Sequence, residues 1–188
     1  TYMGLPEVGV GLLPAGGGCK EFALRAAQEA KNDTLFRDLQ LYFKQIAMAE
    51  ISTSAEEAKQ KGYLRPADII VMHAREIFAI AKQQAAALAL AYRPPLAPRI
   101  PVAGENAIAT LKTQLVNLRE GRFISEHDYL IGCKIAEVIC GGELPAGTLV
   151  DEEWFLRRER EAFVALAQTV KTQARIEHLL KTGKPLRN

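Results

Sequence analysis

One carboxylate stands beside a glycine-rich turn near the start of the chain. Glu7 precedes an apolar run that ends at Pro14 and the glycines 16–18. Because Gly9 and Gly11 interrupt this run, the segment is predicted to be a short extended stretch or a buried loop. Burial among apolar groups raises the pKa of a carboxyl group, which suits a general acid or base working near neutral pH. Glu7 is therefore the candidate catalytic residue, and a solvent-facing loop glutamate is the alternative.

The glycines do not fit either common nucleotide-binding motif. A phosphate-binding loop needs a lysine directly after its last glycine, but Cys19 separates Gly18 from Lys20. The dinucleotide fingerprint needs three glycines at fixed spacing, and the two possible registers place Pro14 or Glu21 at the third position. The glycines are instead predicted to form a turn that leads into a helix from about Lys20.

Composition narrows the class of protein. Charged residues make up 24% of the 188 residues, apolar residues 48%, and the formal net charge is +2, so the strongly basic surface of a nucleic-acid binder is not indicated. The longest apolar run, 84–92, is far shorter than the roughly 20 residues of a membrane span. No secretory signal opens the chain. We expect a cytoplasmic protein with no nucleic-acid partner and no membrane span.

The cysteines and histidines do not suggest a metal or nucleophile site. Cys133 and Cys140 share one predicted helix, which places their Cα atoms about 10 Å apart, too far for a disulfide, so buried thiols are predicted. The histidines lack metal-ligand spacing, and no catalytic triad is readable. No metal site and no cofactor-binding residue is therefore predicted. Surface or hydrogen-bonded structural roles are expected for His73, His127 and His178.

Helical periodicity dominates the remaining sequence. Residues 32–34 are predicted to end one helix and cap the next, and residues 54–57 to form a capping box. A brief strand is predicted at 67–71. The mixed charges of 157–161 are typical of a solvated, ion-paired helix face. The expected helices cover residues 20–31, 35–49, 55–61, 74–92, 105–120, 126–140, 152–169 and 172–181.

Four prolines between Pro94 and Pro101 mark the clearest internal boundary, because prolines this dense cannot continue a helix and favour an extended linker. We therefore expect one domain over 1–93, a proline-rich linker over 94–102 and a helical extension over 103–188.

Residues 4–18 resemble the signature of the crotonase family, the enoyl-CoA hydratases and isomerases, in which a Pro-Glu pair opens an apolar run ending in proline and glycines. Residues 51–64 resemble a later family segment, an Ile-Ser pair followed by a helix start and a glycine turn. Residues 103–188 are similar to the helical tail of bacterial fusion proteins that carry 3-hydroxyacyl-CoA dehydrogenase ahead of a crotonase-like part, notably over 141–145 and 171–188. Together these resemblances cover nearly the whole chain.

The resemblance implies a mainly α chain: the helical C-terminal part of a crotonase-like α/β spiral domain in 1–93, and a helical extension. At most one or two short strands near the N-terminus are expected. It also implies a piece of a longer fatty-acid β-oxidation enzyme, inactive alone, whose parent hydrates or isomerises enoyl-CoA and carries 3-hydroxyacyl-CoA dehydrogenase activity. NAD would belong to the dehydrogenase part and to no residue of this chain.

Within that family, Glu7 matches the glutamate that moves protons at the α and β carbons of an acyl-CoA substrate. The second glutamate, the oxyanion-hole amides and most of the CoA site are expected upstream of Thr1. Cys19 stands where the family usually has Thr or Ser, which puts the side-chain cap of the following helix in question. The expected partners are acyl-CoA, the upstream part of the same polypeptide and a possible second copy. The alternative is a non-catalytic helical docking or oligomerisation module. Acyl chain length, and hydratase against isomerase, stay open.

Overall fold

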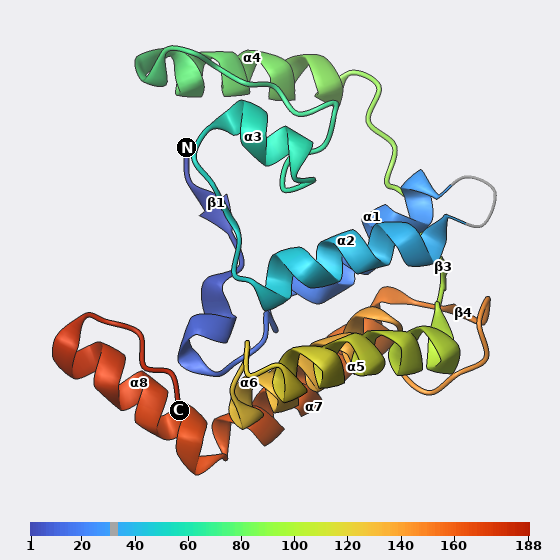
Figure 1. Cartoon of the computed structure of the whole chain (residues 1–188). Helices are drawn as coiled ribbons and strands as arrows, with labels where there is room; N and C mark the ends of the chain where they lie inside the picture. The colour runs from blue at the N-terminus through green and yellow to red at the C-terminus, as the bar shows by residue number, and fades with distance from the viewer. Residues whose placement is uncertain (31–33) are drawn as a thin grey trace. The chain divides into compact units, whose positions relative to one another are not determined.

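The computed structural model describes residues 1–30 and 34–188, and helices form most of them (Figure 1). The prediction of a mainly helical chain is confirmed. The predicted stop at 32–34 lies largely outside the described residues. Within the described ranges, no helix is both long and apolar enough to cross a membrane.

The chain divides into two compact units. The first comprises Thr1–Met3 and Ser52–Ala97, and the second comprises Gly4–Ile51 and Pro98–Asn188. One boundary between them falls inside the proline-rich connection. The units group the residues differently from the domains expected at 1–93 and 103–188, which remain a prediction.

In the first unit, the short helix α3 (Ala55–Gln60) is capped as predicted, because the Ser54 hydroxyl accepts a hydrogen bond from the Glu57 N–H at 3.0 Å. The predicted strand at 67–71 is wrong. The Asp68 carboxylate accepts from the Arg65 N–H at 2.7 Å and closes a local turn in its place. A 3-10 turn, η2 (Ala74–Glu76), then leads into the exposed helix α4 (Ile77–Ala89).

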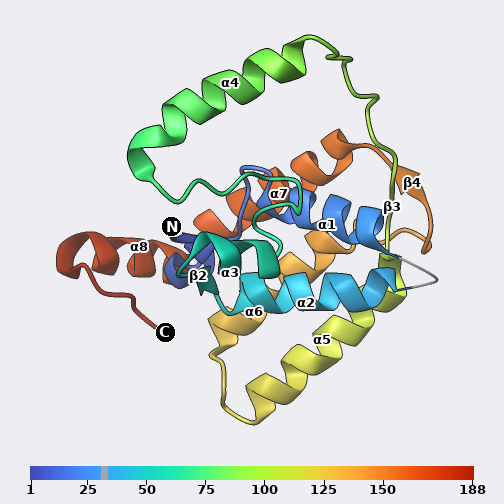
Figure 2. The same ribbon diagram turned by 90° about the horizontal axis from the view of Figure 1, so that it is seen from above.

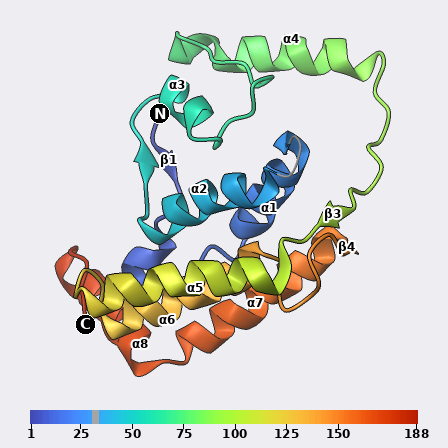
Figure 3. The same ribbon diagram turned by 45° about the vertical axis from the view of Figure 1, so that its right-hand side comes forward.

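The second unit is a helical body organised around α6 (Glu126–Ile139) (Figures 2 and 3). Helix α6 packs against α1, α2, α5 and α7, and its buried face includes Ile131, Ile135, Val138 and Ile139, which recur at helical spacing. Between α1 and α2, the rings of Phe22 and Tyr42 stack with centroids 4.3 Å apart. The helices of this unit are α1 (Gly18–Glu29), α2 (Leu35–Ala47), α5 (Gly104–Glu120), α6 (Glu126–Ile139), α7 (Glu152–Ala167) and α8 (Val170–Thr182).

Within residues 1–30 and 34–188, the strands form only two-residue pairs. β1 (Met3–Gly4) pairs with β2 (Ile51–Ser52), and β3 (Ile100–Pro101) pairs antiparallel with β4 (Leu149–Val150). The second pair was not expected, since strands were predicted only near the N-terminus. Two residues are too few for the alternating pattern that identifies a strand in a sequence.

Candidate active site around Glu7

Glu7 lies in a short 3-10 turn, η1 (Pro6–Val10), and not in the extended stretch or loop predicted for it. Pro6 suits the first position of the turn, where no N–H donor is needed. Gly11 ends the turn in the left-handed conformation, with its N–H donating to the Val8 carbonyl at 3.0 Å. The Leu12 N–H donates to the Glu7 carbonyl at 3.1 Å. The backbone from Glu7 to Leu12 is therefore held by local hydrogen bonds.

The Glu7 side chain lines a cavity of about 350 Å³. The residue is half-buried, and its Oε2 atom is buried without a hydrogen-bond partner among the described residues. Burial raises the pKa of this carboxyl group, and a hydrogen bond from the residue's own backbone N–H acts in the opposite direction. The desolvation predicted for Glu7 is present, while its catalytic role remains a prediction. The other lining residues are Leu13, Ala15, Gly16, Arg160 and Phe163.

The glycine turn beside this cavity is held by a carboxylate from the other end of the sequence. Glu159 Oε2 accepts from the Gly17 N–H at 2.8 Å, and Glu159 Oε1 accepts from the Lys20 N–H at 2.7 Å. The side chain thus caps the N-terminus of α1, where N–H groups lack partners inside the helix. Cys19 takes no part as a side-chain cap, because its thiol donates to the Pro14 carbonyl at 3.5 Å.

The prediction that residues 157–161 form a solvated face is wrong for Glu159, which is 0% exposed. Glu159 follows Phe155 by four residues and precedes Ala162 by three, so it lies on the buried stripe of α7. That spacing was the signal available in the sequence. Burial raises the pKa of Glu159, while the N–H donors of the capped turn oppose the shift. The charged neighbours on the same run are exposed, as predicted: Arg157, Arg158, Arg160 and Glu161.

Helix α7 also supplies two residues to the Glu7 cavity that no sequence argument assigned to a site. Phe163 presents an aromatic ring, and Arg160 presents a cation whose guanidinium lies 3.7 Å from the Glu153 carboxylate near the solvent. The cavity therefore combines a desolvated acid and an apolar wall with an ion-paired arginine at its exposed edge. Such a site can exchange a proton with a ligand whose reacting part is apolar.

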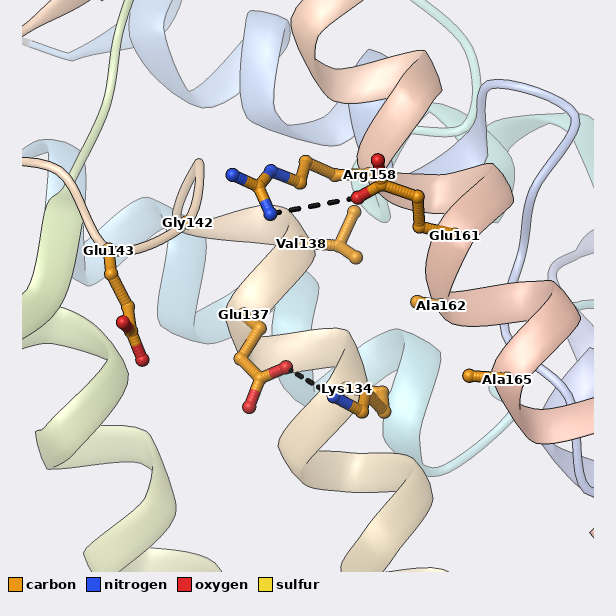
Figure 4. Close-up of a pocket in the computed structure, with 9 residues that line it drawn as sticks. All are labelled: Lys134, Glu137, Val138, Gly142, Glu143, Arg158, Glu161, Ala162 and Ala165. Carbon is orange, nitrogen blue, oxygen red and sulfur yellow. Dashed lines mark hydrogen bonds and ion pairs between the residues drawn. The ribbon is translucent and has the colours of Figure 1, made fainter.

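A larger cavity of about 570 Å³ lies between α6 and α7 (Figure 4). Four of its charged side chains form ion pairs: Lys134 pairs with Glu137 at 2.8 Å, and Arg158 pairs with Glu161 at 3.6 Å. These pairs are partly exposed, and ion pairs of this kind contribute little to the free energy of folding. The cavity is therefore a solvated surface cleft, and the Glu7 cavity is the better candidate for chemistry.

The cysteines and histidines considered in the sequence have ordinary structural roles. Cys19, Cys133 and Cys140 are buried free thiols, as predicted for the latter two. His73 is exposed, His178 is half-buried, and His127 is buried and hydrogen-bonded. Over the described part of the chain, no cluster of three or more His, Cys, Asp or Glu side chains could hold a metal ion.

The chain is similar to one curated bacterial protein. It is 43% identical over 192 residues to a protein of Bacillus subtilis (strain 168) named "Probable 3-hydroxyacyl-CoA dehydrogenase". The match covers 100% of this chain but 24% of that protein. The chain thus spans about a quarter of its relative. No family model and no solved structure matches it.

Proposed function

We propose that this chain belongs to a longer fatty-acid β-oxidation enzyme that hydrates or isomerises enoyl-CoA thioesters, with Glu7 as the proton-transfer residue. The observation that carries the proposal is the half-buried Glu7 carboxylate, with one oxygen unpartnered, in a cavity beside a glycine turn. The similarity to a protein named a probable 3-hydroxyacyl-CoA dehydrogenase supports an acyl-CoA substrate.

The chemistry follows from the carboxyl group. An unpartnered oxygen is free to accept a hydrogen bond from a ligand, and a raised pKa makes the protonated and ionised forms closer in free energy near neutral pH. In a hydratase, Glu7 would deliver a proton to Cα as water adds at Cβ. In an isomerase, it would move a proton between the two carbons. The donors that stabilise the enolate oxygen would come from polypeptide outside this chain.

The glycine turn at the start of α1 does not suit the pyrophosphate of NAD. A pyrophosphate could be bound by N–H groups at the N-terminus of α1, but the Glu159 carboxylate already accepts from the N–H groups of Gly17 and Lys20 there. A second anion there would meet like charge. We therefore assign NAD, and the dehydrogenase step, to the remaining part of the longer protein.

The test is Glu7→Gln in the intact protein that contains this chain. Turnover of a short-chain enoyl-CoA is expected to fall at least about a hundredfold, the low end for removing a general acid or base. Glu161→Gln is the matched control, since Glu161 is an exposed glutamate of α7 outside the Glu7 cavity. Unchanged turnover in Glu7→Gln would contradict the assignment. An intact wild-type protein with no activity on enoyl-CoA would favour the docking-module alternative.

A further inference from the structure

The turn that carries Glu7 rests on the C-terminal helix α8. In Figure 1 the blue turn η1 and the red helix α8 lie side by side, and the two elements are in contact. At this contact the Thr172 hydroxyl donates to the Gly11 carbonyl at 2.8 Å, across 161 residues of sequence. Thr172 is 0% exposed, so water does not compete for this hydrogen bond.

A buried histidine completes the arrangement. His127 Nε2 lies 2.8 Å from Thr172 Oγ1. A hydroxyl has one hydrogen to donate, and Thr172 gives it to Gly11, so Oγ1 accepts a hydrogen bond from the Nε2–H of His127. The ring is therefore held with Nε2 protonated. Burial lowers the pKa of His127, aided by Arg175 and Lys171 and opposed by Asp128, so the neutral ring with this tautomer prevails at neutral pH.

Thr172 packs directly against the backbone of the turn at Gly11. A Cβ atom placed on Gly11 would lie 2.7 Å from Thr172 Oγ1 and 3.2 Å from His127 Nε2. The glycine thus allows α8 to approach the backbone directly. Gly11 in turn bonds Val8, and Leu12 bonds the Glu7 carbonyl, so the position of Thr172 is transmitted to the backbone of Glu7 through hydrogen bonds.

We propose that Thr172 and His127 are positioning residues for Glu7: their buried hydrogen-bond chain fixes the height and tilt of the turn that presents the carboxylate. This inference rests on the proposed function. Neither side chain lines the Glu7 cavity, so both act through Gly11 and not on the substrate. Catalysis is sensitive to such placement, because misplacing a reacting group by about 1 Å can lower the rate about a hundredfold.

The experiment is Thr172→Val in the intact protein, which keeps the shape of the side chain and removes its hydroxyl. We expect kcat on enoyl-CoA to fall at least about tenfold with KM changed less than about twofold, since the contact orients the acid and leaves ground-state binding alone. Thr172→Ser restores the hydroxyl and is expected to keep kcat within about twofold of the wild type.

Two further comparisons distinguish a specific effect on the position of Glu7 from a general destabilisation of α8. Thr169→Ala removes the cap of the same helix, where the Thr169 hydroxyl accepts from the Thr172 N–H at 3.3 Å, without touching Gly11. It should lower the unfolding temperature and spare kcat. His127→Gln keeps an N–H donor near the place of Nε2 and should retain more turnover than His127→Leu, which has none.

Equal losses of kcat in Thr172→Val and Thr169→Ala would overturn the positioning role, as would failure of Thr172→Ser to restore turnover. If Glu7→Gln is inactive while Thr172→Val is fully active, the proposed function stands and this inference fails. If Glu7→Gln itself is fully active, the proposed function fails, and the inference fails with it.

Discussion

The carboxylate of Glu159 lies 2.8 Å from the N–H of Gly17, although 142 residues separate them in sequence. The contact joins α7 to the glycine turn beside the Glu7 cavity, and the next residue, Arg160, lines the cavity itself. The C-terminal helices are therefore part of the scaffold of the candidate site. A chain cut before α7 would leave the start of α1 without its cap.

Glu159→Ala should destabilise the chain strongly. The substitution leaves the N–H groups of Gly17 and Lys20 buried without an acceptor, and each such group costs about 1–3 kcal/mol. We expect the free energy of unfolding to fall by about 2–4 kcal/mol in urea denaturation. Glu161→Ala, on the exposed side of the same helix, should change it by less than about 0.5 kcal/mol. Similar effects of the two substitutions would show that the buried cap is unimportant.

How far the sequence determines this site is clearest in α7. Its extent and apolar stripe were predictable, because Phe155, Ala162 and Leu166 recur at helical spacing and all are buried. Glu159 lies on the same stripe. A carboxylate can be buried there only if N–H groups from the end of a distant helix donate hydrogen bonds to it. These N–H groups reach Glu159 only when α1 and α7 pack together. Local patterns therefore identify the helices and leave long-range hydrogen bonds such as that of Glu159 undetermined.

The same limit applies around Glu7 itself. The apolar run broken by glycines indicated a buried setting, and the half-buried carboxylate agrees with that, whereas the 3-10 turn that carries Glu7 was not predicted. Sequence reasoning gave no reason to connect the turn with Thr172, because that contact spans 161 residues. Conversely, residues 67–71 have the composition of a strand, yet a strand needs a partner edge, and the turn closed by Asp68 forms in its absence.

Acid should weaken the pair formed by Arg175 and Asp128, whose atoms Nη1 and Oδ1 lie 2.8 Å apart. Burial opposes ionisation of Asp128, but hydrogen bonds from Arg175 and Ser125 outweigh it, so its pKa is lowered from 3.8. A lowered pKa in the folded state contributes stability that is present above pH 3.8 and lost as the pH falls below it toward the folded-state value.

Asp128→Asn tests that pair. Near neutral pH it should lower the free energy of unfolding by about 2–3 kcal/mol, less than the roughly 3–5 kcal/mol for a fully buried pair, because Asn188 still accepts from Arg175 Nε at 2.9 Å. Denaturant titrations of wild type and variant should converge as the pH falls below 3.8. A difference that persists unchanged in acid would contradict the assigned ion pair.

The cysteines should differ in reactivity. Burial raises the pKa of Cys19 well above its usual value, with Glu159 and Glu7 adding to the shift, and burial raises that of Cys140 to about 12. Cys133 is 9% exposed, and a hydrogen bond from Tyr129 partly offsets the rise in its pKa. With a thiol-reactive disulfide reagent at mildly alkaline pH, Cys133 should react first in the folded chain. Cys19 and Cys140 should react only under unfolding conditions, and fast native labelling of either would count against this packing.

Two glycines provide a matched test that separates the effect of side-chain packing from the effect of backbone conformation. Gly141 and Gly147 have nearly the same left-handed φ, 85° and 82°. A Cβ atom on Gly141 would lie 2.3 Å from Val102 Cγ1, whereas nothing lies within 4 Å of one on Gly147. Gly147→Ala should therefore cost only the conformational strain, about 1–2 kcal/mol. Gly141→Ala should cost about 1–3 kcal/mol more, because Val102 is 1% exposed and has no room to move away.

Urea denaturation of both alanine variants measures that difference, and Trp154, the one tryptophan of the chain, supplies a local signal. Its indole N–H donates to the Gly141 carbonyl at 2.8 Å, so Gly141→Ala should also shift the tryptophan emission of the folded protein, whereas Gly147→Ala should leave it unchanged. Adding Val102→Ala to Gly141→Ala should restore part of the lost stability, as expected for two residues in direct steric conflict. Equal destabilisation by the two glycine substitutions would mean that the backbone conformation alone requires glycine at 141, with Val102 imposing no steric limit.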